Sequence, residues 1–254
     1  MTPSQIALQL YTLRDYCKNS TEFASTLRRV REIGYPAVEM VRLEFLSYPE
    51  IRKMADDAGL RISSIHENPS RLLDEPERVI DEIRALGTNL AVYPYPRDIH
   101  LDEAASVRNL AERMGRSAAK FAEGGSRLAY HNHAVEFVRH DGELALTTIL
   151  KANSQLQAEL DTYWVQFGGG NILGWIESLH GRLPLLHLKD YQFDPIKNQP
   201  RMAELGQGNL DWSKILAAGD GAKVEWFVVE QDYCAGDPFD SIRVSYEFLC
   251  GLKG

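Results

Sequence analysis

Residues 74–93 read DEPERVIDEIRALGTNLAVY, and their pattern predicts one helix followed directly by one strand. Asp74 can cap a helix, Pro76 suits its first turn, and Glu77 is an acid three residues after the cap. Gly87 then supplies a stop, after which a short apolar run is typical of a strand. Before the glycine, apolar residues recur at helical spacing, namely Val79, Ile80, Ile83 and Leu86.

The same alternation of strand and helix extends over the chain. Amphipathic stretches separate eight apolar or β-branched runs, at 6–10, 37–40, 61–66, 89–93, 127–131, 157–160, 185–188 and 224–230. Strands that alternate with helices must be parallel and joined by crossover helices. Eight such units in 254 residues predict an α/β fold, a closed (β/α)8 TIM barrel formed by residues 1–254 as a single domain. An open dinucleotide-binding sheet is disfavoured, because no G-x-G-x-x-G follows the first run.

Composition limits the binding partners and the cell compartment that we expect for this protein. Lys and Arg number 28 against 36 Asp and Glu, so the net charge is −8 and nucleic acid is not an expected partner. The three cysteines form no C-x-x-C pair and are expected to be free thiols. Without a basic and apolar leader or a run of 18 apolar residues, we expect a cytoplasmic protein with no membrane partner. An oligomer is compatible with the sequence.

Polar residues at the predicted strand ends form a candidate metal site, since reactive groups of such barrels come from the C-terminal ends of the strands. Four residues on successive units are natural ligands for one divalent ion: Glu136, Asp161, His187 and Glu230. Three carboxylates and one imidazole favour Mn²⁺, with Mg²⁺, Co²⁺, Fe²⁺ and Zn²⁺ as alternatives, over a structural zinc site. For any one acid taken alone, the alternative is a helix cap or a lysine partner.

Two further patterns each have two interpretations. His131 and His133 are two residues apart, so on an extended chain they face the same side and can both point into the site. The alternative is that one of them bonds a neighbouring backbone group. Gly206-Gln207-Gly208 is typical of a turn into a helix capped by Asn209 or Asp211, although such a helix start can also hold an anion.

The chain resembles the sugar phosphate isomerase/epimerase family, the xylose-isomerase-like barrels. The motifs that carry the resemblance are Gly34-Tyr35-Pro36-Ala37-Val38-Glu39, Ile65-His66, Tyr130-His131-Asn132-His133-Ala134-Val135-Glu136-Phe137, Glu159-Leu160-Asp161-Thr162-Tyr163-Trp164, His187-Leu188-Lys189-Asp190, Gly206-Gln207-Gly208 with Asp211-Trp212, and Val229-Glu230. The resemblance implies one divalent ion held by Glu136, Asp161, His187 and Glu230. One position departs from the family: where many epimerases have a glutamate on the fifth strand, this chain has His131, so His131 or His133 competes with Glu136 as the ligand.

The resemblance implies a metal-dependent sugar isomerase or epimerase. Its substrate would be a keto-sugar, a sugar phosphate or a sugar derivative, which loses a proton α to a metal-bound carbonyl and gives an enediolate. The residues expected to move the proton are Glu136, Glu230, His131 and His133. Those expected to contact the substrate are Gln9, Glu39, His66, Trp164 and Lys189. The alternative within the family is a lyase or dehydratase, acting on a 3-keto-glycoside or an inosose by β-elimination.

The sequence disfavours two other classes of function. A DNA-repair phosphodiesterase on the same barrel needs more metal ligands and a basic groove, and the charge of −8 disfavours it. A barrel that only binds a sugar or a metal is disfavoured by the many titratable groups at the strand ends.

Overall fold

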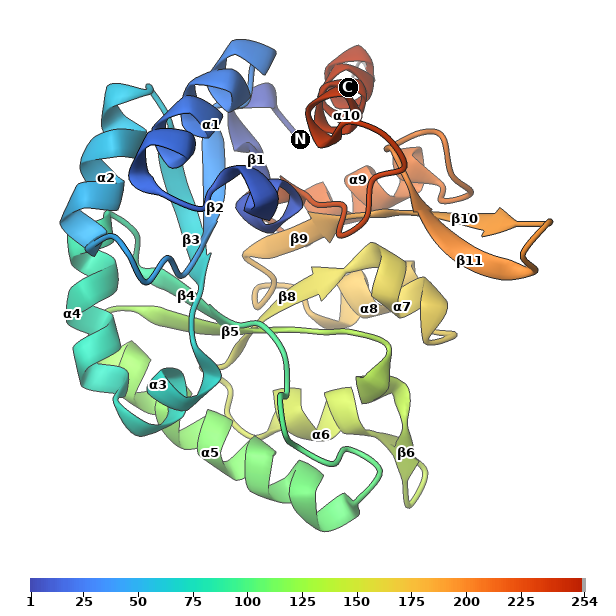
Figure 1. Cartoon of the computed structure of the whole chain (residues 1–254). Helices are drawn as coiled ribbons and strands as arrows, with labels where there is room; N and C mark the ends of the chain where they lie inside the picture. Colours follow the sequence, from blue (N-terminus) through green and yellow to red (C-terminus); the bar gives the residue numbers. More distant parts are fainter. Residues whose placement is uncertain (253–254) are drawn as a thin grey trace.

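Eight parallel strands form a closed barrel in the computed structural model, which describes residues 1–252 (Figure 1). Each barrel strand pairs with the next one along the chain, and the last pairs with the first. The strands are β1 (Ile6–Gln9), β2 (Ala37–Val41), β3 (Arg61–His66), β4 (Leu90–Tyr93), β5 (Arg127–His131), β8 (Gln157–Asp161), β9 (Leu185–Leu188) and β12 (Trp226–Val229). All eight predicted runs are therefore barrel strands, and the predicted fold is confirmed.

Helices surround the barrel and follow the strands in the chain. They are α1 (Ser20–Ile33), α2 (Tyr48–Asp57), α3 (Pro69–Asp74), α4 (Pro76–Leu86), α5 (Ala104–Glu123), α6 (Ala145–Lys151), α7 (Thr162–Phe167), α8 (Ile172–Ser178), α9 (Trp212–Gly221) and α10 (Pro238–Gly251), with 3-10 turns η1 (Pro3–Gln5), η2 (Leu10–Tyr16) and η3 (Val135–Phe137). Two hairpins extend the loops, β6 (Arg139–His140) with β7 (Glu143–Leu144) and β10 (Asp190–Asp194) with β11 (Gln199–Ala203). Within residues 1–252, no helix has the length and apolar character needed to cross a membrane.

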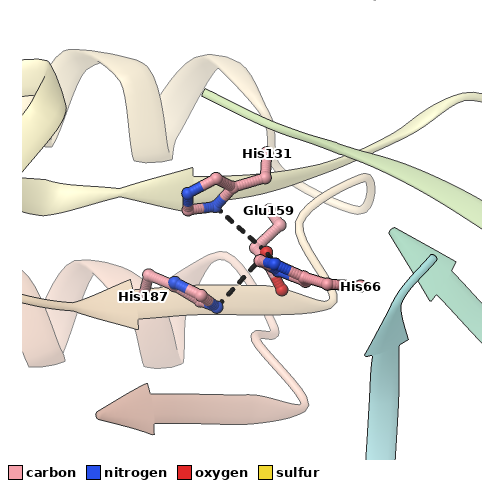
Figure 2. A group of neighbouring side chains, drawn as sticks. All are labelled: His66, His131, Glu159 and His187. Atoms are coloured by element: carbon pink, nitrogen blue, oxygen red, sulfur yellow. Dashed lines mark hydrogen bonds and ion pairs between the residues drawn. The ribbon is translucent and has the colours of Figure 1, made fainter. Parts of the chain in front are cut away.

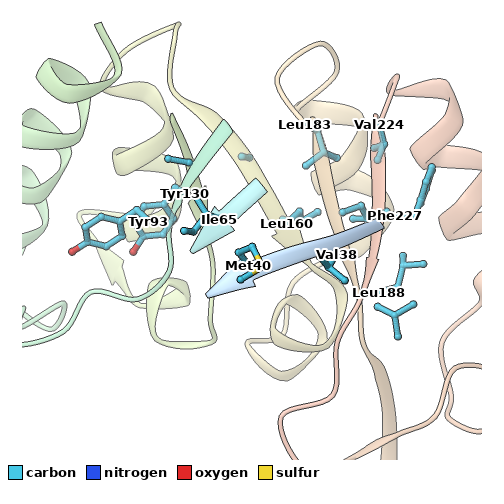
Figure 3. Packing of buried hydrophobic residues seen from close by; sticks show 14 of the residues in the cluster. Val38, Met40, Ile65, Tyr93, Tyr130, Leu160, Leu183, Leu188, Val224 and Phe227 are labelled. Carbon is cyan, nitrogen blue, oxygen red and sulfur yellow. The ribbon is translucent and has the colours of Figure 1, made fainter. Parts of the chain in front are cut away.

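The two faces of the strands bury different side chains, because successive residues of a strand point to opposite sides. One set includes Val38, Ile65, Leu160 and Phe227 (Figure 3). It belongs to the large core cluster, which also includes buried residues of the surrounding helices. The other set is a second, small cluster of seven buried residues, here named the apolar floor: Ala7, Ala37, Leu90, Val92, Ala129, Leu185 and Val228.

The candidate site begins two residues beyond the apolar floor. Five floor residues are each followed, at the next position on the same face, by a buried polar residue. These five, here named the polar layer, are Gln9, Glu39, His131, His187 and Glu230. The barrel interior thus changes from apolar to polar within two residues along each of these five strands.

The helix start predicted at Asp74 is displaced. Asp74 is the last residue of α3, and Pro76 is the first residue of α4, after a non-helical Glu75 with φ −131° and ψ 43°. The cause is an earlier cap, since the Asn68 side chain accepts a hydrogen bond from the backbone N–H of Ser70 at 2.9 Å. The expected Asp74 cap was therefore wrong, while the helical face after Pro76 and the stop at Gly87 are confirmed.

The Gly206-Gln207-Gly208 turn holds an anion that belongs to the chain itself. The fully buried Asp190 carboxylate accepts five N–H hydrogen bonds of 2.8 to 3.3 Å, from the backbone of Tyr191, Gly206, Gly208 and Leu210 and from the indole of Trp212. A side chain at Gly208 would clash with that carboxylate, which explains the glycine. Asp211 caps α9, as one of the two predicted candidates, by accepting the N–H of Lys214.

The substitution Asp190→Asn should lower the free energy of unfolding by roughly 3 kcal/mol. The asparagine NH2 group would face backbone or indole N–H groups that now donate to the carboxylate, and the negative charge that strengthens the remaining hydrogen bonds would be lost. Urea unfolding monitored by circular dichroism measures the loss. Asp211→Asn is the matched control, since asparagine caps an exposed helix as well as aspartate does. Equal stability of the two variants would contradict the role given to Asp190.

Candidate active site and metal centre

Four side chains converge at the polar layer, here named the Asp161 group: His131, His187 and Glu230 of that layer, and Asp161. Each offers one ligand atom, and these atoms all lie within 4.8 Å of one another. Nδ1 of His187 is 3.0 Å from Oε2 of Glu230 and 3.9 Å from Oδ2 of Asp161. Nε2 of His131 is 3.9 Å from the same Asp161 oxygen. Three of the four predicted ligands are thus brought together, with His131 as the fourth member.

A second cluster, the Glu159 group, contains His66, His131, Glu159 and His187 (Figure 2). One oxygen of Glu159, Oε2, lies 2.6 Å from Nε2 of His66, 3.0 Å from Nδ1 of His131 and 3.2 Å from Nε2 of His187. Sequence reasoning gave Glu159 no role. A signal was present, because Glu159 precedes Asp161 by two residues on β8 and therefore shares its face.

Glu136 belongs to neither group. Its carboxylate is fully buried and accepts hydrogen bonds from the hydroxyl of Tyr130 at 2.9 Å and from the backbone N–H of His133 at 2.8 Å. Burial raises the pKa of Glu136 to about 7, and these hydrogen bonds only partly oppose the rise. The structure therefore does not bring Glu136 to the other predicted ligands, because hydrogen bonds from Tyr130 on β5 and from the backbone of His133 hold it.

Lys189 supplies a buried positive charge to the Asp161 group. Its Nζ is 3.0 Å from Oδ2 of Asp161, 2.8 Å from Oε2 of Glu230 and 3.1 Å from Oδ2 of Asp232. Burial opposes the charge on Lys189, but the three carboxylates outweigh it and hold its pKa well above the ordinary value. Burial likewise opposes ionisation of Glu230, but Lys189 and His187 outweigh it and keep the pKa of Glu230 well below its ordinary value.

The imidazoles differ in charge because their neighbours differ. Burial lowers the pKa of His131. Burial is also the main cause that lowers the pKa of His133 to about 2, and the nearby His131 and Lys189 lower it further. Both rings are therefore neutral near pH 7, as a metal ligand or a proton acceptor must be. For His66 and His187, burial is outweighed by the carboxylates of Glu39 and Glu159, so their pKa values are raised.

A cavity of about 700 Å³ opens over these groups, and the predicted substrate-binding residues divide in their relation to it. His66 lines the cavity together with His131, His133 and Glu230. Gln9 and Glu39 are fully buried and hydrogen-bond each other at 2.7 Å, so they do not reach the cavity. Lys189 and Trp164 are not lining residues either, although the Trp164 ring lies 5.2 Å from the ring of His133.

The outer wall of the cavity comes from loops that sequence reasoning did not single out. Its residues include Tyr11, Arg14, Arg42, Tyr95 and Arg97. Arg42 is neutralised by Glu44 at 2.8 Å, whereas Arg14 donates only to the backbone carbonyls of Tyr11 and Asp232, both at 2.9 Å. Loop residues of this kind show no periodicity, so their convergence appears only in the folded chain.

The donor set fits a divalent cation. Oδ2 of Asp161 is buried and receives no well-aligned hydrogen bond, which is unusual for a carboxylate oxygen inside a protein. It lies 3.0 Å from Nζ of Lys189 and 3.9 Å from two imidazole nitrogens, beside the Glu230 carboxylate in the same group. Two nitrogen and two oxygen donors, without thiolate, suit Mn²⁺, Fe²⁺, Co²⁺ or Zn²⁺.

Comparison with known proteins identifies one curated sequence relative and several solved structures with a similar fold. The chain is 22% identical over 261 residues to an inosose dehydratase of Geobacillus kaustophilus (strain HTA426), a match covering 88% of this chain and 85% of the relative. Its fold is similar to a sugar phosphate isomerase/epimerase from Parabacteroides distasonis, with a TM-score of 0.81, 24% identity and coverage of 99% and 95% of the two chains. It is also similar to an L-ribulose 3-epimerase, with a TM-score of 0.74, 14% identity and coverage of 96% and 93%.

The family assignment rests on a match over most of the chain. Residues 27–250 match the sequence profile described as xylose isomerase-like TIM barrel. The closed eight-stranded barrel agrees with that description, and the resemblance predicted from the motifs is confirmed. The chain belongs to the xylose isomerase-like TIM barrel family.

Proposed function

We propose that this protein is a divalent-metal-dependent enzyme that removes a proton α to the carbonyl group of a sugar or sugar derivative. The observation that carries the proposal is the Asp161 group, in which a buried carboxylate oxygen without a well-aligned hydrogen bond lies close to two imidazoles. Two members of the group, His131 and Glu230, line the cavity. The ion expected is Mn²⁺, held by His131, Asp161, His187 and Glu230.

The residues have distinct tasks in this proposal. A bound divalent ion supplies a Lewis acid that polarises a carbonyl oxygen. The Glu230 carboxylate is ionised, lines the cavity and can accept a proton there. The neutral His133 imidazole also lines the cavity, and we propose it as the second residue that handles the proton. His66, whose raised pKa favours the imidazolium, can donate a hydrogen bond to substrate oxygen.

Isomerisation or epimerisation is the reaction we propose, because proton acceptors on two residues, Glu230 and His133, can serve removal and return of a proton. The epimerase among the structural relatives supports this choice. β-Elimination is the second candidate, supported by the similarity to an inosose dehydratase. The substrate in either case is a small polyhydroxylated carbonyl compound, free or phosphorylated.

Solvent isotope exchange tests the proposed reaction. The Mn²⁺-loaded protein, incubated in ²H₂O with a panel of free and phosphorylated keto-sugars, should place deuterium on a carbon next to the carbonyl and form an isomer. An unsaturated carbonyl product that absorbs ultraviolet light would instead identify β-elimination. If neither exchange nor elimination occurred over the whole panel while Mn²⁺ was bound, proton abstraction would be refuted.

Metal affinity tests the ligand set. Calorimetric titration of chelator-treated protein should show one Mn²⁺ site, and Asp161→Asn should weaken it by roughly 100-fold or more, beyond the usual cost of changes outside the ligand shell. Asparagine keeps the cap that Asp161 gives to the N–H of Trp164, so the fold should persist. His131→Gln should weaken binding to a similar degree, whereas Glu136→Gln should leave it unchanged. Loss of binding in Glu136→Gln alone would return the ligand role to Glu136.

The buried Glu136 should also shape the dependence of stability on pH. Its pKa is raised in the folded state from an ordinary 4.5 to about 7, so the fold loses stability as pH rises through this interval. We expect the wild type to lose roughly 3 kcal/mol relative to Glu136→Gln between about pH 4.5 and pH 8. Urea unfolding of both proteins across this range measures the difference, and a constant difference would contradict the buried, proton-binding carboxyl.

A further inference from the structure

His131 and His187 belong to both the Asp161 group and the Glu159 group. In each ring, one nitrogen faces a carboxylate deep in the barrel and the other faces a carboxylate of the Asp161 group. Nε2 of His187 lies 2.6 Å from Oε2 of Glu39, and Nδ1 lies 3.0 Å from Oε2 of Glu230. Nδ1 of His131 lies 3.0 Å from Oε2 of Glu159, at ion-pair distance but without well-aligned hydrogen-bond geometry, and Nε2 faces Asp161 at 3.9 Å. Each ring therefore connects a carboxylate of the deep interior with the Asp161 group.

The chemistry of imidazole makes this arrangement directional. A neutral ring has one N–H and one nitrogen lone pair, and an ionised carboxylate can only accept a hydrogen bond. In a ring that binds a metal, the nitrogen that faces a deep carboxylate therefore keeps the proton, and the opposite nitrogen presents its lone pair to the Asp161 group. Because the pKa of His187 is raised, this ring would release its Nδ1 proton when a cation binds. In metal sites, partners of this kind fix the tautomer and the orientation of the ligand ring.

The deep carboxylates are themselves held in place. Glu39 is fully buried on β2, where its Oε2 accepts from Nε2 of Gln9 at 2.7 Å and its Oε1 from the hydroxyl of Ser64 at 2.5 Å. The three residues are paired in register on adjacent strands, Gln9 with Glu39 and Glu39 with Ser64. Glu159 is fully buried on β8, and its Oε2 also accepts from His66 at 2.6 Å.

We propose that Glu39 and Glu159 are positioning residues for the metal centre, which hold His187 and His131 in the tautomers that direct Nδ1 of His187 and Nε2 of His131 at the cation. The proposal rests on the proposed function and adds a role for two residues that do not reach the cavity. It also assigns the cation to the Asp161 group rather than the Glu159 group. In the Glu159 group three ring nitrogens crowd one carboxylate oxygen at 2.6 to 3.2 Å, whereas Oδ2 of Asp161 lies 3.9 Å from both ring nitrogens of its group.

Nitrogen NMR of the zinc-loaded protein tests the tautomers directly, with Zn²⁺ as a diamagnetic probe. Long-range ¹H–¹⁵N correlation should show His187 with a proton on Nε2 and zinc on Nδ1, and His131 with a proton on Nδ1 and zinc on Nε2. Zinc on Nε2 of His187 or on Nδ1 of His131 would place the ion in the Glu159 group and overturn the proposal.

Graded variants separate positioning from simple packing. Glu39→Gln keeps an acceptor oxygen for His187 without the charge, so zinc affinity should fall roughly 10-fold with the tautomer retained. Glu39→Met fills the space without an acceptor, so affinity should fall roughly 100-fold and the His187 tautomer should change. Glu159→Gln should weaken zinc binding roughly 10-fold and alter the His131 spectrum. Competition with a chelating dye measures each affinity, and circular dichroism verifies folding.

Glu67→Gln is the matched control, because Glu67 is also a buried carboxylate near the cavity but contacts Tyr48, Arg71 and Arg42 instead of the shared imidazoles. Its zinc affinity should equal that of the wild type. If the wild type binds zinc and Glu39→Met binds it equally tightly through the same nitrogens, the positioning role is overturned and the proposed function stands. If the wild type binds no divalent ion, the proposed function itself is overturned.

Discussion

Glu159 has no access to solvent, so its negative charge must be balanced within the barrel. The imidazoles of His66 on β3 and His187 on β9, whose pKa values are raised, provide that balance, and the neutral His131 ring of β5 lies beside the same oxygen. The three rings lie 2.6 to 3.2 Å from this one carboxylate oxygen. Removing one partner of such a cluster leaves an uncompensated buried charge, a change that typically costs several kcal/mol. The positions of four strands are thereby coupled to one oxygen atom, and the two rings shared with the Asp161 group are placed as a consequence.

The strand repeat of two residues converts this cluster into a layered site. Each of His131, His187 and Glu230 follows an apolar floor residue by two positions, and a further polar residue follows two positions later, namely His133, Lys189 and Asp232. The apolar floor closes the barrel below, and the polar layer carries three of the four residues of the proposed metal site, His131, His187 and Glu230. The residues two positions further along supply groups that line the cavity, His133 and Asp232, and the Lys189 ammonium that balances the carboxylate charges.

Carboxylates in this chain differ in role according to what their own loops offer. Glu136 finds two hydrogen-bond donors within six residues and turns to them, although its position in a motif suggests a metal ligand. Asp190 collects five N–H groups from the following turn and becomes a structural anion. One oxygen of Asp161 accepts the N–H of Trp164, and the other lies 3.0 Å from Nζ of Lys189 without a well-aligned hydrogen bond, so Asp161 is the carboxylate that we propose as a cation ligand.

Sequence alone determined the eight strand and helix units, the closed barrel and the end of the barrel at which polar residues gather, because periodicity and strand order are properties of consecutive residues. It also indicated three of the four members of the Asp161 group. The tertiary structure decided that His131 replaces Glu136 in that group, that Gln9 and Glu39 lie beneath the cavity, and that Glu159 joins three imidazoles. The direction of a side chain after a strand end depends on which donors and acceptors the fold places around it, and these come from segments as distant as Glu39 and His187.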